Sequence, residues 1–297
     1  MSKIGIVTVL YNSENVLSDF FDSLEKQTYK DFILYVIDNK SPDNSLAKAK
    51  LLASTHNFTT RIFAEEENWG VAKGNNIGII NALSDNCQYV LLANNDVILH
   101  ETTIETLLHG LLFMNVKIAV PKIYFCDSRR FYSTGGYFCR FKALTPHRGY
   151  NKIDNGQYDS FEIVEYAPTC FMLIDASVFY EVGLMDEKYF VYYDDSDFIW
   201  RATKCHRNKI AYIYNSSLEH KESYSTGGAQ SDFAIYYSCR NAIYFANKNY
   251  TLIFRILAFI FQIMHTYMRK PFIYPKVKVN VAKKALRDGF KMCGNSH

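Results

Sequence analysis

The chain has 297 residues, of which 48% are hydrophobic and 16% aromatic, and its formal net charge is +3. This composition supports a large core and excludes a disordered chain, and the small net charge gives no reason to expect a nucleic-acid partner. The seven cysteines are scattered without a CxxC pair, which argues against zinc and disulfide frameworks and favours a reducing cytoplasm.

The first part of the chain alternates strand and helix patterns. Apolar, β-favouring runs predict strands, and apolar residues at helical spacing predict helices. The predicted strands are residues 4–10, 32–37, 61–64 and 89–93, and the predicted helices are residues 15–27, 45–54 and 71–83. This order predicts an α/β fold with a doubly wound, mostly parallel sheet. The first strand begins at once, with no signal-peptide pattern before it.

The pattern changes after about residue 120, where short strands and Gly-rich turns appear. Residues 170–175 predict a further strand, and residues 176–183 predict a helix that ends at a glycine. We therefore expect one continuous domain over residues 1–245, with parts 1–120 and 121–245, and a helical, basic extension over residues 246–297.

Two polar clusters follow apolar runs in this domain. Asn94-Asn95-Asp96 follows the run 89–93, and Asp194-Asp195-Ser196-Asp197 follows the run 190–193. We expect both runs to be buried strands that end at a site, because open α/β sheets bind ligands at the carboxyl ends of their strands. One carboxylate for a metal and another for proton abstraction would equip the protein for metal-dependent group transfer.

The C-terminal region combines an apolar stretch with an excess of positive charge. Residues 252–268 are apolar but interrupted by Arg255, Gln262 and His265, and are short and polar for a transmembrane span. Such a helix lies on a membrane surface or packs on the core, and the sequence leaves both open. From residue 269 onward the sequence contains many basic residues and a single acidic one, Asp288. This excess of positive charge indicates an anionic surface near this end of the chain. The basic residues are Arg269, Lys270, Lys276, Lys278, Lys283, Lys284, Arg287 and Lys291.

An ordered set of motifs resembles the inverting family 2 glycosyltransferases with a GT-A fold, particularly the rhamnosyltransferase-like and galactofuranosyltransferase-like members. Each motif is weak alone, but together they cover most of the chain. The matching stretches are Thr8-Val9-Leu10-Tyr11-Asn12, Asp38-Asn39-Lys40-Ser41-Pro42-Asp43, Asn68-Trp69-Gly70 continuing to Asn76, Asn94-Asn95-Asp96, Gly183-Leu184-Met185-Asp186 continuing to Asp194-Asp195-Ser196-Asp197, and Tyr236-Tyr237-Ser238-Cys239-Arg240-Asn241.

The resemblance implies a divalent cation, Mg²⁺ or Mn²⁺, held by Asp96 with His220. Asn94-Asn95-Asp96 stands where the family usually carries Asp-x-Asp, but two of its positions are amides and a single carboxylate remains. Oxygens of the donor diphosphate would supply further ligands. The alternatives are an Asn-rich turn that closes a strand and a histidine with an ordinary polar role.

The resemblance also implies a catalytic base and a set of donor contacts. Asp195 is the candidate base that takes the proton of the acceptor hydroxyl, and Asp194 is the alternative, because adjacent positions cannot be separated without a register. An acidic helix N-terminus would explain the same residues and is compatible with a base. The implied donor-binding residues are Thr8, Tyr11, Asp38, Lys73, Asn95 and Arg240. For Arg240 a structural ion pair is an equal alternative.

The function that the resemblance implies is inverting transfer of a sugar, with rhamnose and galactofuranose as candidates, from a dTDP- or UDP-linked donor. The acceptor would be a glycan or polyprenyl-linked glycan in the synthesis of a surface polysaccharide such as O-antigen. Residues 1–120 would bind the nucleotide and residues 121–245 the acceptor, whose identity depends on loops around residues 130–165 and 220–235.

The implied location is the cytoplasm, with peripheral attachment at the inner face of the cell membrane and a homodimer as an option. Two other functions stay open. A nucleotidyltransferase also uses an α/β sheet and metal-held phosphates, but the stretch 8–12 lacks the Gly-rich, basic phosphate loop that it would need. A non-catalytic glycan-binding protein is the alternative of another class.

Overall fold

The N-terminal half of the chain forms the alternating units that the sequence predicts. The structure is a computed structural model that describes residues 3–221 and 231–294. Its first strands are β1 (Ile4–Leu10), β2 (Phe32–Asp38), β3 (Thr59–Ala64) and β4 (Tyr89–Ala93). The helices between them are α1 (Leu17–Glu25), α2 (Ser45–Thr55) and α3 (Gly70–Ser84). These strands pair in parallel, as helical crossover connections require.

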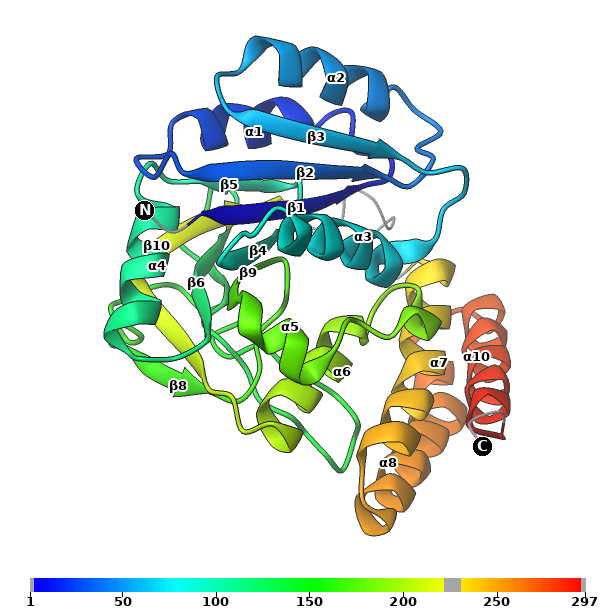
Figure 1. The fold of residues 1–297 in the computed structure, drawn as a ribbon. Coiled ribbons are helices and arrows are strands. Elements are labelled where there is room, and N and C mark those ends of the chain that lie inside the picture. The colour runs from blue at the N-terminus through cyan, green and yellow to red at the C-terminus, as the bar shows by residue number, and fades with distance from the viewer. Residues whose placement is uncertain (1–2, 222–230, 295–297) are drawn as a thin grey trace.

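Different helices bury the two faces of this sheet. Ile4 and Ile6 of β1 pack in the core that contains α1, whereas Val7 packs in the core that contains α3. Successive side chains of a strand point to opposite faces, so one strand serves both cores. Figure 1 shows α1 and α2 on one side of the sheet and α3 on the other. Every residue of β2 and β4 is therefore buried.

The second half completes the sheet with a different pairing. Its strands are β5 (Val97–Leu99), β6 (Ile118–Phe125), β7 (Phe131–Ser133), β8 (Glu162–Val164), β9 (Phe171–Asp175) and β10 (Ile210–His220). The order across the sheet is β3-β2-β1-β4-β9-β6-β10-β5, with β7 beside β6 and β8 beside β10. β9 runs antiparallel to both β4 and β6, while β10 is parallel to β6. The predicted α/β fold is thus confirmed, with a sheet that is mixed.

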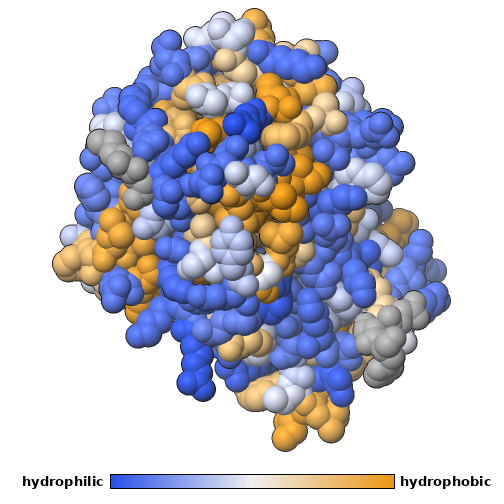
Figure 2. Space-filling view, in the orientation of Figure 1, coloured by the Kyte–Doolittle hydropathy of each residue, from blue (hydrophilic) through white to orange (hydrophobic). Residues whose placement is uncertain are grey.

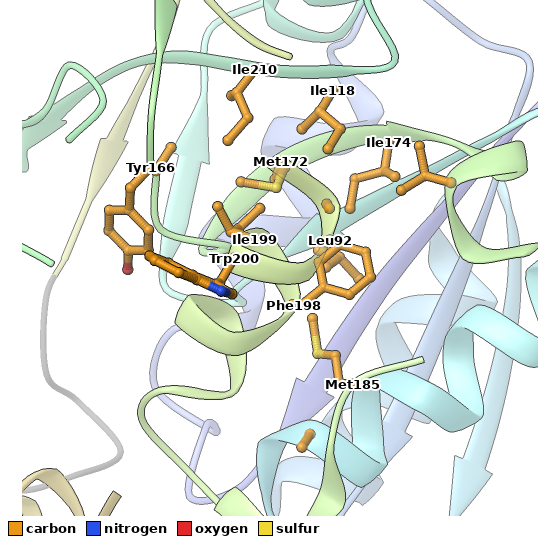
Figure 3. Packing of buried hydrophobic residues seen from close by; sticks show 14 of the residues in the cluster. Leu92, Ile118, Tyr166, Met172, Ile174, Met185, Phe198, Ile199, Trp200 and Ile210 are labelled. Atoms are coloured by element: carbon orange, nitrogen blue, oxygen red, sulfur yellow. The ribbon is translucent and has the colours of Figure 1, made fainter. Parts of the chain in front are cut away.

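Short helices connect these strands. They are α4 (Thr103–Phe113), α5 (Ala176–Val182), a 3-10 turn (Glu187–Tyr189), α6 (Asp194–Trp200) and a π-helical turn (Arg201–Cys205). α5 ends at Gly183, whose φ of 80° needs a residue without a Cβ. Figure 3 shows Phe198 and Trp200 of α6 in the core near Met172 of β9. This packing holds the N-terminus of α6 in place at the sheet.

The strand expected over residues 190–193 is wrong. Phe190, Tyr192 and Tyr193 have φ angles of 66°, 61° and 67°, in the left-handed region that a strand excludes. The backbone is held there by distant parts of the chain. Gly70, at a φ of 83°, lies so close to this loop that an added Cβ would be 2.3 Å from the Phe190 carbonyl oxygen. Such strain in bulky residues is typical of functional loops.

The expected C-terminal helices are present on one side of the sheet domain (Figure 1). They are α7 (Asp232–Asn249), α8 (Leu252–Met264), a π-helical turn (His265–Arg269), α9 (Lys270–Ile273) and α10 (Lys276–Gly294). α10 packs on α7 through small residues, since a Cβ added at Gly289 would come 2.6 Å from the Arg240 carbonyl oxygen. Ala282 and Ala285 are fully buried in the same contact.

Candidate active site

A cavity of about 660 Å³ lies where β1 and β4 end. Asn94-Asn95-Asp96, which directly follows β4, lines it together with Asp194-Asp195-Ser196 at the start of α6. Tyr11, just after β1, and His220, the last residue of β10, also line the wall. The two polar clusters of the sequence therefore meet in one cavity, although one of them follows a loop rather than a strand.

At one end of the cavity Asp96 and His220 form a buried pair. The His220 Nε2 atom lies 3.1 Å from Asp96 Oδ1, because the backbone of His220 pairs with Val97 and Lys221 N–H donates to the Asp96 carbonyl. The other ring nitrogen, Nδ1 of His220, is buried without a hydrogen-bond partner in the described part of the chain. The Tyr132 ring packs edge-on against the imidazole, with the ring centres 4.5 Å apart.

The residues of this pair fit a divalent cation. A carboxylate oxygen and an imidazole nitrogen are both accepted by Mn²⁺. Neighbouring ligands around an octahedral ion with bonds of about 2.1 Å lie about 3 Å apart, close to the separation of Asp96 and His220. The cavity leaves space beside the pair for further ligands.

Asn95 connects the ends of β1 and β4. Its Nδ2 donates to the Val9 carbonyl at 2.7 Å, and the preceding Asn94 N–H donates to the Cys170 carbonyl at 2.8 Å. Asn95 thus lines the cavity while its amide holds two strand ends in register. Asn94, which stands at the first carboxylate position of Asp-x-Asp, lines the same cavity.

Asp194, Asp195 and Asp197 occupy three different environments. Asp195 is partly exposed to the cavity, and its Oδ2 accepts the Tyr166 hydroxyl at 2.6 Å. Asp194 is buried, and burial, followed by the charge of Asp195, raises the pKa of Asp194 to about 8. Asp197 points away and pairs with Arg201 at 2.8 Å. Asp194 therefore keeps its proton to higher pH than an ordinary aspartate does.

The carbonyl groups of the loop before α6 are held by the late motif that contains Arg240 and Asn241. Asn241 Nδ2 donates to the carbonyls of Tyr189, Val191 and Tyr192 at 3.0, 2.8 and 2.8 Å. Arg240 Nη2 donates to the Tyr189 carbonyl at 2.8 Å. Arg240 does not line the cavity and forms hydrogen bonds with backbone, so its observed role is to hold the loop.

Buried oxygens at the ends of β1 and β2 lack partners among the described residues. They are Thr8 Oγ1, Asp38 Oδ1, Asn39 Oδ1 and Ser41 Oγ. Thr8 and Asp38 do not line the cavity themselves, whereas Asn39 and Tyr11 do. Buried polar atoms are normally satisfied, so these oxygens are available to ordered water or to a hydrogen-bonding ligand.

Lys73 is not brought into the cavity, since its Nζ lies 3.6 Å from the centre of the Trp69 ring and outside the cavity wall. Two aromatic residues of the wall were not predicted from the sequence. Tyr166 contacts Asp195, and His147 lies between Tyr132 and Tyr166, with ring centres 5.1 and 6.2 Å away. Burial lowers the pKa of His147, which keeps the ring neutral. Only the excess of tyrosine hinted at such a wall.

The loops expected to select the acceptor are described in part. Residues 132, 145 and 147 of the first loop line the cavity. Within the second, residues 222–230 lie outside the described residues.

The fold can be compared with solved structures. Structures of S. aureus TarS in complex with UDP-GlcNAc (14% identity, TM-score 0.62) and of the mannosyltransferase PcManGT from Pyrobaculum calidifontis in complex with GDP-Man and Mn²⁺ (13% identity, TM-score 0.58) share the fold. The matches cover 97% and 98% of this chain and 81% and 75% of those chains. This likeness shows that the chain has the GT-A fold.

The chain belongs to glycosyl transferase family 2, whose model matches residues 5–183. Glycosyltransferase GlyG of Streptococcus pneumoniae is 26% identical over 63% of this chain and 61% of its own length, less than two thirds of that relative. A low-salt glycan biosynthesis hexosyltransferase of Haloferax volcanii is 23% identical over 84% of this chain and 76% of its own length. The predicted enzyme class and family are confirmed. The rhamnosyl- or galactofuranosyl-specific subtype stays a prediction.

Proposed function

We propose that this protein transfers a sugar, with inversion, from a nucleotide-diphosphate donor to the hydroxyl group of a glycan or polyprenyl-linked glycan. One observation carries the proposal: the Asp96–His220 pair and the Asp195–Tyr166 pair line the same cavity. The first pair suits a divalent cation that would bind a diphosphate, and the second suits a reacting hydroxyl. Neither a nucleotidyltransferase nor a glycan-binding protein needs a separate carboxylate base of this kind.

The nucleotide would bind at the ends of β1 and β2. There the unpartnered oxygens of Thr8 and Asp38 lie next in sequence to cavity residues. Asp38 would accept the N3–H of a uracil or thymine base, and the Tyr11 ring would cover it, which favours a UDP- or dTDP-linked donor. GDP-Man in the Pyrobaculum mannosyltransferase makes guanine the alternative base.

Asp96 and His220 would hold a divalent cation, Mg²⁺ or Mn²⁺. When bound, such an ion supplies positive charge that stabilises the departing diphosphate. Asn95 would keep the end of β4 in place beside it through its bond to the Val9 carbonyl. Lys73 and Arg240 lie outside the cavity, so a direct donor contact by either would require a local rearrangement.

Asp195 would act as the base. Its carboxylate lines the cavity and is oriented at both oxygens, since Oδ2 accepts the Tyr166 hydroxyl and Oδ1 accepts the Ser196 N–H and hydroxyl. As the acceptor oxygen attacks the anomeric carbon, its proton passes to Asp195 and the bond to the diphosphate breaks on the opposite face. Asp194, which is buried and whose pKa is raised by that burial, is the weaker candidate.

We place this reaction in the cytoplasm, in the synthesis of a surface glycan, with rhamnose and galactofuranose as the first sugars to test. A panel of UDP-, dTDP- and GDP-sugars, with Mn²⁺ or Mg²⁺, identifies the donor by thermal stabilisation. Incubation with the stabilising donor should then release the nucleoside diphosphate, and NMR of a product should show the inverted anomer. Release of pyrophosphate would indicate nucleotidyl transfer, and binding without turnover would indicate a glycan-binding protein.

A further inference from the structure

The helical segment over residues 252–273 is amphipathic, but its apolar side is exposed and its more polar side is buried against the protein. Within the described part of the chain it is the one segment long and apolar enough to cross a membrane. A surface helix normally turns its apolar side inward and its polar side to water. Here the fully buried side chains are small or polar, with Phe254 and Phe259 half-buried beside them, and the most exposed side chains are aliphatic or aromatic.

The inward face is fixed to the protein by polar contacts. It consists of Ala258, Gln262, Thr266 and Lys270, at intervals of one helical turn, and all four are buried. Gln262 Nε2 donates to the Lys142 carbonyl at 2.7 Å, and Lys270 Nζ donates to Cys239 Sγ of α7 at 2.7 Å. Lys270, expected from the sequence to belong to a basic surface, therefore does not contribute to one.

The outward face is a continuous apolar stripe. Its exposure is large, at 91% for Phe272, 70% for Ile253 and 61% for Met268. Spacings of three and four residues place its members along one side of the helix. They are Ile253, Ile256, Leu257, Ile260, Ile263, Met264, Tyr267, Met268 and Phe272. Figure 2 shows apolar surface at the lower edge of the molecule, where Figure 1 places the end of α8.

Positive charge flanks this stripe. The Lys283 ammonium lies 4.9 Å from the ring of Tyr267, and Lys142 lies 5.3 Å from the ring of Phe261. Further along α10, Lys276, Lys284, Arg287 and Lys291 are exposed. Between residues 250 and 294 Asp288 is the single acid, and it accepts the Tyr236 hydroxyl at 2.9 Å.

We infer that residues 252–273 lie in the interface of an anionic lipid bilayer, with the outward stripe inserted among the acyl chains and the basic residues of α10 at the headgroups. The inference goes beyond the proposed sugar transfer and does not depend on it. An apolar stripe bordered by Lys and Arg matches both parts of such a surface. A stripe of this size exposed to water would otherwise be an aggregation hazard.

Two other arrangements agree less well with the contacts. A transmembrane span would pull Gln262 and Lys270 away from the Lys142 carbonyl and Cys239, and would expose both to hydrocarbon. A second copy of the chain packed on the stripe about a two-fold axis would bring the two sets of basic residues together. A lipid surface with negative charge avoids both costs.

The attachment would also orient the cavity. The Lys142 carbonyl that holds Gln262 is followed by the Ala143 carbonyl, which accepts the Tyr193 hydroxyl at 2.6 Å, and by Thr145 in the cavity wall. A single short loop thus connects this helix with Tyr193, which lies two residues before the candidate base Asp195. The cavity would in this way be kept near acceptors anchored in the same bilayer.

The experiment is co-sedimentation of the full chain with vesicles of phosphatidylcholine alone or with 30% phosphatidylglycerol. We expect binding to the anionic vesicles, weakening as salt rises. The triple variant Ile253→Ser, Ile260→Ser, Phe272→Ser should lose binding at least tenfold. The variant Lys276→Glu, Lys284→Glu should lose about 30-fold or more, because each basic residue near an anionic surface contributes about 1 kcal/mol.

Matched controls alter equally exposed residues on other helices. Leu51→Ser, Ile80→Ser, Leu112→Ser removes exposed apolar side chains from α2, α3 and α4, and Lys26→Glu, Lys50→Glu reverses exposed charges. Both should bind like the original protein. Nucleoside diphosphate release with a short, soluble acceptor, which reads the proposed function separately, should be unchanged in every variant.

Three outcomes would overturn the inference. One is equal recovery in the supernatant with and without anionic vesicles. Another is a stable dimer by light scattering that becomes a monomer in the triple Ser variant, with no vesicle binding. The third is equal loss of binding in the control variants.

Discussion

The Tyr166 hydroxyl donates to Asp195 Oδ2 at 2.6 Å, across a gap of 29 residues in the chain. Burial, followed by the charge of Asp195, raises the pKa of Tyr166 well above its usual value, so the hydroxyl keeps its proton and remains a donor. One oxygen of the carboxylate is thereby fixed in direction. This contact makes Tyr166 a positioning residue for the candidate base.

Tyr166→Phe should lower kcat about tenfold and leave the Kd for the donor within twofold, because the lost hydroxyl orients the carboxylate and does not touch the nucleotide. Asp195→Asn should cost on the order of 10²–10⁴ in kcat. A normal kcat in Tyr166→Phe would remove Tyr166 from the mechanism.

Replacing Asp96 with Asn should abolish measurable transfer and lower the affinity for Mn²⁺, and His220→Ala should weaken the ion while leaving some activity. Asp96 Oδ1 and His220 Nε2 lie 3.1 Å apart in a buried pair. Each substitution therefore removes one of the atoms that would bind the ion. Binding of Mn²⁺ in the presence of nucleoside diphosphate, followed by its paramagnetic signal, measures the effect. His109→Ala, at an exposed position of α4, is the control. Full turnover after chelation of all metal would contradict this prediction.

Asp194→Asn should stabilise the protein increasingly as pH rises. The pKa of Asp194 is raised from 3.8 to about 8, so between these values the native state holds a proton that the unfolded state releases. The free energy of unfolding therefore falls across this window. Asn cannot release a proton, so the free energy of unfolding of the variant does not fall in this way. At pH 7.5 the variant should be more stable than the original protein by on the order of a few kcal/mol. Urea unfolding of the metal-free protein at pH 5 and 7.5 tests this.

The control for this pH experiment is Glu66→Gln, which alters an exposed carboxylate. Its stability should follow that of the original protein at both pH values. A constant difference between Asp194→Asn and the original protein would mean that Asp194 is ionised throughout.

Asn241→Ala should destabilise the protein by about 2–4 kcal/mol, since loop carbonyls lose their donor and buried acceptors without partners cost about 1–3 kcal/mol each. Asn241→Asp should destabilise the protein more than Asn241→Ala, although Asp has the shape of Asn. A carboxylate oxygen would replace the donor nitrogen and lie against three carbonyl oxygens. Urea unfolding measures both, with exposed Asn155→Ala as the control. If the Asp variant is as stable as the original, Asn241 does not clamp this loop.

The parallel half of the fold could be read from the sequence because its signals are local. β4 occupies the residues that its apolar run predicts, and α5 ends at the expected Gly183. β9 was also expected as a strand, but its antiparallel place between β4 and β6 was not, because periodicity reveals an element and not its partners.

Fewer features of the site could be predicted from local sequence patterns. Phe190 to Tyr193 has the composition of a strand, and it adopts a left-handed loop because Asn241 and Gly70, both remote in sequence, hold it there. Tyr166 has no motif around it that marks a contact with Asp195. Asp96 and His220 were named together through family resemblance, and their contact depends on the pairing of β10 with β5.

The position of β9 also has a consequence for biosynthesis. As the chain emerges from the ribosome, β1 to β4 can assemble, but the edge of β4 stays open until residues 171–175 arrive to fill it. An apolar strand whose edge is exposed can pair wrongly with strands of other nascent chains. A fragment that stops at residue 120 should therefore precipitate on expression, whereas one that extends past β10, which covers the other edge of β6, should stay in solution. The two halves of the sheet must therefore fold as one unit.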